Sequence, residues 1–318
     1  MLLSILHHLN LQLGYERTKE IFNQILKEIP VVIVEFALKE EKVDLSWKEL
    51  LQDDPLDMIE NKEEYNIVKM GEYPTHLSDV KRPMYAISKN HLVVNNKIYP
   101  VEDTFFQAYK YSKSSAYKIF YRSEDYFIKQ ISLLENQFAQ DTIKNQFFSA
   151  IFILSKIQAL NLNLPKLIDY EIKGKTAYIV TTRIKGKLVS DLLVTLSINQ
   201  KIIIINYLLE TLKALKNAGL YHNDVRPWNV MFDIDTNEAT LFDFGLSSIY
   251  ETENTLISFS WMVHALISEK IIIHPNPILN KADFKGLTIP YEFIDFLKKI
   301  SSDETKSLED LGKIIQKD

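Results

Sequence analysis

Glycine is scarce in this sequence. Its 318 residues include eight glycines, where average usage would give roughly 22. The closest two, Gly174 and Gly186, are twelve positions apart, so neither Gly-x-Gly-x-x-Gly nor Gly-x-x-x-x-Gly-Lys can be written anywhere. This excludes a Rossmann dinucleotide fingerprint, a P-loop and the usual glycine-rich lid of kinases. Any nucleotide site in this chain must therefore have an unusual phosphate loop or none.

Cysteine is absent, which excludes disulfides, a thiolate nucleophile and cysteine-ligated metals. The 37 basic and 42 acidic residues give a formal net charge of −5, which is no argument for a nucleic-acid or anionic-membrane partner. No segment offers the ~18 uncharged apolar residues of a transmembrane helix. The N-terminus lacks the basic region and cleavage site of a signal peptide. We expect a cytoplasmic protein with no nucleic-acid partner and no transmembrane segment.

Residues 1–94 alternate apolar runs with an amphipathic stretch, which indicates an α/β domain. A helix is predicted over 16–28, where Ile21 and Ile25 share one face. The predicted strands are 2–6, 31–37, 65–73 and 83–89. The first two are apolar throughout, as in a parallel sheet that is buried on both faces. We interpret this region as the second half of an α/β sheet and place its boundary before the polar, turn-rich residues 95–104.

The rest of the chain is predicted to form an α+β domain of two lobes. In the first lobe, 95–187, three short strand patterns make an antiparallel meander, followed by a long helix over 132–159 and two more strands. The meander strands are 106–111, 116–121 and 126–131. Helices dominate the second lobe, 188–318, and one of them runs over 199–217 to a C-cap at Gly219.

One constellation in these lobes carries chemistry. Asp224 and Asn229 are five positions apart on a loop that follows a helix, and Asp243 opens an Asp-Phe-Gly fourteen positions further on. Lys129 ends the third meander strand. Taken singly, each would be a solvated strand or loop residue. Together they match the protein-kinase signature of strand lysine, His-x-Asp-x-x-x-x-Asn and Asp-Phe-Gly in order, spacing and context.

Phosphoryl transfer requires positioning and charge stabilisation, and these residue types supply both. Lys129 would hold the α- and β-phosphates of ATP as a point charge. Asn229 and Asp243 offer the hard oxygen ligands that Mg²⁺ prefers. Asp224 would orient the acceptor hydroxyl and accept its proton, and Arg226 would reach the transferred phosphate.

Supporting positions follow from the same pattern. His222 is interpreted as a structural prop of the loop, and Gly245 as part of the metal-binding turn. The hinge is expected at 181–186, with backbone groups of Thr182 and Ile184 facing adenine. Within the lid of sequence YSKSSAYK (111–118), Ser114 and Ser115 would offer hydroxyls and N–H groups to phosphate. The alternative is a simple hairpin turn with no ligand.

Several longer stretches resemble one particular family. They are SILHHL (4–9), VVIVEFALKEE (31–41), DDP (53–55), THLSDVKRPMYAIS (75–88), SEDYFIK (123–129), GKLVSDLL (186–193) and YHNDVRPWNVMFD (221–233). The sequence is similar to the bifunctional methyltransferase/kinases that terminate polymannose O-antigen chains. The resemblance implies a class I methyltransferase domain with a Rossmann-like sheet, followed by a kinase domain that phosphorylates the terminal sugar of the glycan. It also implies ATP, Mg²⁺ and S-adenosylmethionine as cofactors, and work beside a membrane-bound glycosyltransferase or polymerase at the inner face of the membrane.

The sequence departs from this family in three places. The glycine-containing turn for S-adenosylmethionine would precede residue 1, so we expect only the C-terminal half of the methyltransferase sheet and no S-adenosylmethionine binding by this chain alone. A partner chain with the missing half would restore methyl transfer. The position of the helix glutamate that would pair with Lys129 falls near Ala150, and the lid has serines in place of glycines.

The sequence therefore predicts a Mg-ATP-dependent kinase that acts on a sugar hydroxyl of a lipopolysaccharide O-antigen glycan. Two alternatives stay open. The chain is a non-catalytic pseudokinase or scaffold, which the missing glutamate and the serine lid would suit, or it is a protein Ser/Thr kinase with the same chemistry and another acceptor.

Overall fold

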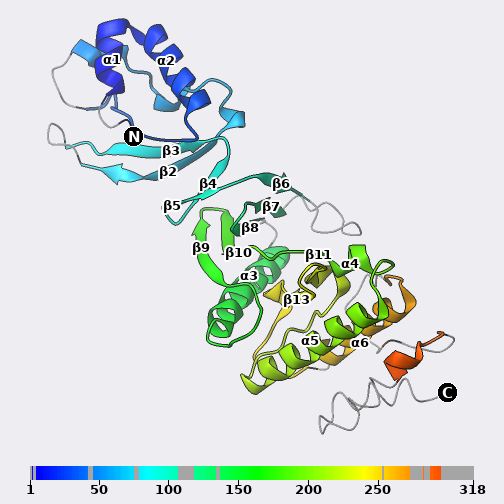
Figure 1. Cartoon of the computed structure of the whole chain (residues 1–318). Helices are drawn as coiled ribbons and strands as arrows, with labels where there is room; N and C mark the ends of the chain where they lie inside the picture. The colour runs from blue at the N-terminus through cyan, green and yellow to red at the C-terminus, as the bar shows by residue number, and fades with distance from the viewer. Residues whose placement is uncertain are drawn as a thin grey trace. The chain divides into compact units, whose positions relative to one another are not determined.

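A computed structural model gives the fold of this chain. It describes residues 2, 5–41, 46–74, 79–106, 118–133, 137–252, 254–272, 282 and 287–294. The chain divides into two compact units, 1–103 and 104–318 (Figure 1).

The described helices and strands are as follows. The α-helices are α1 (Leu6–Leu13), α2 (Tyr15–Glu28), α3 (Gln137–Ile157), α4 (Val189–Leu192), α5 (Ile198–Asn217) and α6 (Asn254–Ser268). The strands of the first unit and its boundary are β1 (Val31–Glu35), β2 (Asn66–Tyr73), β3 (Arg82–Ser88), β4 (His91–Val94), β5 (Lys97–Pro100) and β6 (Asp103–Phe105). The remaining strands are β7 (Lys118–Arg122), β8 (Tyr126–Ser132), β9 (Leu167–Lys173), β10 (Thr176–Thr182), β11 (Lys187–Leu188), β12 (Val230–Asp233) and β13 (Glu238–Leu241).

The sheet of the first unit has the order β1-β3-β2, and all its pairs are antiparallel. Among the described residues of this unit, parallel pairing is limited to one bridge, between Leu2 and Val34. The prediction of a strand over 2–6 is wrong at its end, because Leu6 already begins α1. The prediction of a parallel sheet around 31–37 is wrong on one side of β1. An apolar run indicates only that a strand is buried on both faces. An inner strand has this burial whether its neighbours are parallel or antiparallel to it.

Helices α1 and α2 lie over one face of this sheet (Figure 1). The helix predicted over 16–28 is confirmed as α2, whose Phe22 and Leu26 lie one turn apart and are buried. They pack with Val32 and Val34 of β1 in one apolar core. Residues four apart share a helix face, so this spacing buries one side of α2 against the sheet.

A hairpin of β4 and β5 ends the first unit, and its two strands were not predicted from the sequence. Its turn residues Asn95 and Asn96 have φ of 49° and 60°. Asparagine tolerates this left-handed conformation, which a two-residue type I′ turn needs at both positions. The boundary predicted at 94/95 falls inside this turn, whereas the division into units follows Asp103.

A buried ion-pair network also stabilises the first unit. The guanidinium of Arg82 binds both carboxylate oxygens of Glu41, at 2.7 and 2.8 Å, and reaches Glu35 at 3.1 Å. Arg82 and Glu41 are exposed by 4% and 0% of their side-chain area. Burial alone would raise the pKa of Glu41, but the hydrogen bonds from Arg82 and from the N–H of Leu38, together with the charge of Arg82, outweigh it and lower the pKa. The carboxylate is therefore charged in the folded protein.

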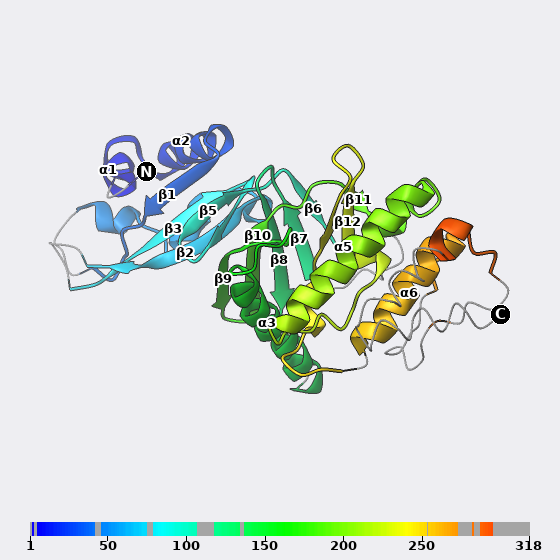
Figure 2. The ribbon, with the colours of Figure 1, turned by 60° about the horizontal axis from the view of Figure 1, so that its bottom comes forward.

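The second unit begins with a five-stranded antiparallel sheet of order β6-β7-β8-β10-β9. Helix α3 packs beside it (Figures 1 and 2), and its Phe147, Ile153 and Ile157 join Ile131 of β8 and Ala177 of β10 in one core. The predicted meander is confirmed for β7 and β8. Most of the strand predicted at 106–111 lies outside the described residues.

The remainder of the second unit is mainly helical. Helix α5, predicted over 199–217, starts at a capping box in which Ser197 and Gln200 satisfy each other's backbone N–H groups. Helices α5 and α6 run alongside each other in both views, next to the small sheet β11-β12-β13. Residues 295–318 lie outside the described part of the chain. Within the part of the chain that is described, no helix has the length and hydropathy to cross a membrane.

Candidate active site

Lys129 and Asp243 meet in the second unit. Lys129 comes from the middle of β8, between β7 and β10, and its Nζ lies 3.1 Å from Oδ1 of Asp243. Loss of water around Asp243 would by itself raise the pKa of its carboxyl, but the charges of Lys129 and Lys118 outweigh it and bring the pKa to about 2. Asp243 is therefore ionised at neutral pH, and it is the carboxylate of the Asp-Phe-Gly turn.

Asp224 and Asn229 are joined directly. The amide nitrogen of Asn229 donates to both the backbone oxygen and Oδ2 of Asp224, at 2.9 and 2.8 Å. Asn229 also bridges to the loop that carries Asp243, because its backbone carbonyl accepts a hydrogen bond from the N–H of Phe242 at 3.0 Å. This network fixes the loop that carries Asp224 next to the turn that carries Asp243.

Arg226 lies against the carboxylate of Asp224. Its Nε is 3.5 Å from Oδ1 of Asp224, and its guanidinium stacks on the ring of Trp228 with 5.2 Å to the centroid. Burial raises the pKa of Asp224, the charge of Arg226 opposes that rise, and the charge of Asp243 adds to it. The carboxylate is thereby more basic than a solvated aspartate, which is the direction that suits a proton acceptor.

His222 is fully buried beneath the two loops. Its Nε2 lies 2.9 Å from the carbonyl oxygen of Phe242, which can only accept, so this nitrogen carries the hydrogen. Its Nδ1 accepts from the N–H of Asp224 at 3.4 Å, and its ring packs edge-on against Phe244. Burial lowers the pKa of His222 to about 4. The ring is therefore neutral, and both of its nitrogens are used to position backbone.

Asn223, which the sequence reading missed, links three segments. It has a left-handed φ of 61°. Its amide nitrogen donates to the carbonyl of Leu246 and to Oγ of Ser248, and its oxygen accepts from the hydroxyls of Thr252 and Thr255. The available signal was an asparagine inside a His-x-Asp turn, since asparagine is the non-glycine residue that tolerates this conformation best.

Comparison with known families decides the class of this site. The protein kinase domain profile matches residues 112–283, more than half of the 318-residue chain. The chain belongs to the protein kinase family. The kinase is also similar to the O-antigen chain terminator bifunctional methyltransferase/kinase WbdD of Escherichia coli. The two are 30% identical over an alignment of 285 residues that covers 84% of this chain. It spans 39% of the length of that relative.

Other similarities agree with this assignment. The serine/threonine-protein kinase D of a Synechocystis species is 27% identical over 173 residues, which cover 52% of this chain and 34% of that protein. A medium-resolution structure of WbdD superposes with a TM-score of 0.58 at 25% identity and covers 98% of this chain and 68% of the other. The crystal structure of monomeric WbdD gives a TM-score of 0.59 at 24% identity, over 100% of this chain and 70% of the other. This kinase is therefore a phosphotransferase distantly related to WbdD, and the kinase domain implies ATP.

One backbone group of the predicted hinge, the N–H of Thr182, is already paired. The backbone N–H of Thr182 donates to the carbonyl of Lys166 at 2.9 Å, and the next N–H, of Arg183, donates to Asp125 at 2.8 Å. The N–H of Thr182 is therefore taken by the neighbouring strand connection. No hydrogen bond of the backbone N–H of Ile184 occurs among the described residues, so its predicted role toward adenine stays a prediction. Strand alternation alone does not say which hinge amides are already paired.

Gly245 follows Asp243 closely but does not need to be glycine for steric reasons. A Cβ there would lie 3.5 Å from Oδ1 of Asp243 and 3.7 Å from Cβ of Gln146, both ordinary contact distances. Gly186 is the opposite case. It has φ of +97°, and a Cβ would collide with the backbone of Phe232. Glycine is thus structurally required after the hinge.

The glutamate that kinases place on this helix has no counterpart among the described side chains of α3. Ala150 is buried in the core, and residues 142–157 include no acidic residue. Glu135 and the side chain of Asp141 lie outside the described part of the chain, as do Ser114 and Ser115 of the lid. Helix α3 is tied to the Asp-Phe-Gly turn by another bond, from the hydroxyl of Ser149 to the carbonyl of Ser247 at 2.5 Å.

Three phenylalanines form a cluster next to Lys129. The ring of Phe120 stacks on Phe105 with 5.4 Å between centroids, and the ring of Phe127 lies 5.9 Å from Phe120 and 6.2 Å from Phe105. Phe120 pairs with Lys129 across β7 and β8, so the cluster and the lysine share one face of the sheet. The sequence reading missed this aromatic surface because Phe105 lies outside the predicted meander.

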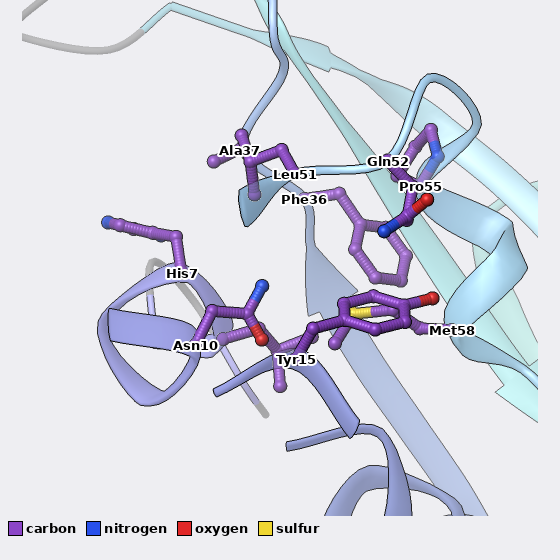
Figure 3. Close-up of a pocket in the computed structure, with 10 residues that line it drawn as sticks. His7, Asn10, Tyr15, Phe36, Ala37, Leu51, Gln52, Pro55 and Met58 are labelled. Carbon is purple, nitrogen blue, oxygen red and sulfur yellow. The ribbon is translucent and has the colours of Figure 1, made fainter. Parts of the chain in front are cut away.

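A small pocket also occurs in the first unit (Figure 3). His7 and Asn10 of α1 line it together with Tyr15, Phe36 and Met58, and Figure 3 shows Asn10 next to Tyr15. Burial lowers the pKa of His7 to about 4, so this ring is neutral. The pocket lies in the other unit from the kinase residues.

Proposed function

We propose that this kinase transfers the γ-phosphoryl group of ATP to a terminal sugar hydroxyl of a polymannose-like O-antigen glycan. The observation that supports this reaction is that two contacts occur in one site, the ion pair of Lys129 with Asp243 and the hydrogen bond of Asn229 with Asp224. The acceptor is proposed from the relationship to WbdD, whose name gives O-antigen chain termination as its role.

The residues would divide the work as follows. Asp224 accepts the proton of the acceptor hydroxyl, while the oxygen of that hydroxyl bonds to the γ-phosphorus of ATP. The bond between the γ-phosphorus and the oxygen that bridges to the β-phosphate breaks, which releases ADP. Arg226 holds the carboxylate of Asp224 in place and adds positive charge near the transferred group. Lys129 holds the α- and β-phosphates, and His222 keeps the two loops in register. General-base assistance of this kind contributes about 10²- to 10⁴-fold.

The donor set fits a magnesium ion bound with the nucleotide. Asp243 is ionised, and the side-chain nitrogen of Asn229 donates both of its hydrogen bonds to Asp224, so the amide oxygen of Asn229 is left as a second hard ligand. Mg²⁺ commonly uses one or two such protein ligands and completes its shell with phosphate and water. When bound, it would neutralise charge on the phosphates. We propose Asn229 and Asp243 as its ligands, and the N–H of Ile184 as the donor to adenine.

For the first unit we propose kinship with the C-terminal half of a class I methyltransferase sheet. The parallel bridge between Leu2 and Val34, with α1 and α2 between them in sequence, supports an α/β origin. The similarity to WbdD over 285 residues extends beyond the kinase profile at 112–283 and supports the same assignment.

Two other functions have specific support. The similarity to the Synechocystis serine/threonine kinase favours a protein acceptor. The buried Ala150, and the absence of acidic residues from positions 142–157 of α3, favour a non-catalytic scaffold.

Phosphate transfer from γ-labelled ATP to mannose oligosaccharides tests the proposal. We expect labelled glycan with the wild-type chain and background with Asp224→Ala. Asp235→Ala, an exposed carboxylate in the turn after β12, is the matched control and should behave as wild type. Labelling of generic peptides in place of glycan would support the protein kinase. Background transfer to both acceptors by the wild-type chain would support the scaffold and contradict the proposed activity.

A further inference from the structure

A second lysine, Lys118, lies on the same face of the sheet as Lys129. Strands β7 and β8 pair with Phe120 opposite Lys129 and with Lys118 opposite Ile131. Residues two apart on a strand share a face, so Lys118 and Lys129 are diagonal neighbours on one side of the sheet. Such diagonal positions are within reach of long side chains.

The same face turns toward the Asp-Phe-Gly carboxylate. Lys129 touches Asp243 at 3.1 Å, and Lys118 is close enough to both that their charges act on it. Burial and, to a smaller extent, the charge of Lys129 lower the pKa of Lys118 to about 8, although the charge of Asp243 opposes the fall. Two cations on neighbouring strands repel each other, and an anion bound between them relieves that repulsion. A polyphosphate is an anion of suitable charge and length.

The sequence gives an independent reason why a second cation is useful here. Kinases of the usual type cover the phosphates with a glycine-rich loop. Residues 111–118 of this chain contain no glycine, and Lys118 is the last residue of that stretch and the first of β7. A lysine at this position would reach a bound phosphate from a strand, where other kinases use a loop.

We propose that Lys118 is a phosphate-binding residue that, together with Lys129, holds the triphosphate of the nucleotide. This inference rests on the proposed function, since it assigns a residue to the same nucleotide site. It predicts that the contribution of Lys118 to binding grows with the number of phosphates on the ligand.

The test measures binding of adenosine, ADP and a non-hydrolysable ATP analogue to the full chain by calorimetry, with Mg²⁺ present. We expect Lys118→Met to weaken binding of the analogue about tenfold or more, as for the loss of one charge-assisted hydrogen bond. The affinity of Lys118→Met for adenosine should differ from that of the wild-type chain by less than about twofold, because adenosine has no phosphate. Lys118→Arg keeps the charge and should retain most of the affinity. Lys166→Met, at an exposed position before β9, is the control and should match wild type.

A second measurement needs no variant. Amine-reactive labelling of the wild-type chain, mapped by mass spectrometry, should show that the ATP analogue protects Lys118 and that adenosine does not. The inference is overturned if Lys118→Met binds the analogue as tightly as the wild-type chain does, or if the analogue does not change the labelling of Lys118. In either case, binding of the analogue by the wild-type chain leaves the proposed function standing. A wild-type chain that binds neither nucleotide would overturn both.

Discussion

The side chains of Lys129 and Asp243 are 114 positions apart in the sequence and 3.1 Å apart in space. One belongs to the inner strand β8 and the other to the turn after β13. The bond thus ties the five-stranded sheet to the mainly helical part of the same unit. Under the proposed function the lysine would bind the phosphates and the aspartate the metal ion, so their contact brings the two binding groups to one place.

The first prediction concerns this aspartate. Asp243→Asn keeps the shape of the side chain but removes the charge that a hard cation prefers. We expect the thermal stabilisation of the wild-type chain by Mg-ATP to be lost in this variant, while the melting temperature without ligand changes by no more than a few degrees. Differential scanning fluorimetry with and without Mg²⁺ measures both. Persistence of the Mg-dependent shift in Asp243→Asn would show that the metal has other ligands.

The second prediction compares two glycines. Gly186→Ala should destabilise the second unit by about 2 kcal/mol or more, because a Cβ meets the backbone of Phe232 and φ is +97°. Gly245→Ala has room for its methyl group and should cost less than about 1 kcal/mol. Urea unfolding of both variants measures the difference. Equal losses would contradict the described packing at Gly186.

The third prediction is a pH dependence of stability. The pKa of His222 is about 4 in the folded protein against 6.5 for the free side chain. Between these values the unfolded chain binds the proton and the folded chain does not, so stability falls as the pH is lowered from 6.5 to 4. The full effect of such a shift is about 3 kcal/mol.

Unfolding free energies measured across this pH range test the third prediction. His222→Gln, which retains an N–H donor for the carbonyl of Phe242, should reduce the slope for the second unit. His7, whose pKa is also about 4, gives the first unit a similar dependence that His222→Gln leaves unchanged. An unaltered slope in the second unit would mean that His222 is protonated in the folded protein.

The fourth prediction contrasts two ion pairs of the first unit. Arg82→Met leaves the buried carboxylate of Glu41 without its partner and should destabilise the unit by about 3–5 kcal/mol. Lys69→Met removes an exposed pair with Glu72 and should leave the stability of the unit almost unchanged, because solvent screens this pair. Thermal unfolding monitored by circular dichroism separates these outcomes. A mild effect of Arg82→Met would indicate that water reaches Glu41 in the variant.

Much of the second unit could be predicted because its signals are local. Apolar periodicity located α3 and α5, and the spacing of Asp224, Asn229 and Asp243 located the loops. Lys129 was placed on the correct strand because the meander connectors are polar and short. Each of these four residues is of a type that is common in loops and strands, but their order and spacing together are specific for the protein kinase signature.

The features that sequence reasoning missed depend on pairing between segments. A buried strand reads the same in parallel and antiparallel sheets, so the neighbours of β1 were not predictable. Lys118 faces Lys129 only through the register of β7 with β8, which no single strand encodes. The hydrogen bond that occupies the N–H of Thr182 likewise comes from a residue sixteen positions away.

Asn223 has one further consequence. Its side chain bonds to Leu246, Ser248, Thr252 and Thr255. Helix α6 begins at Asn254, only eleven positions after Asp243. The segment that in many kinases is long enough to be ordered by phosphorylation is here short and bonded at several points to the loop before Asp224. A conformational switch of the kind that phosphorylation produces in a long activation segment is therefore not expected of this short, bonded segment.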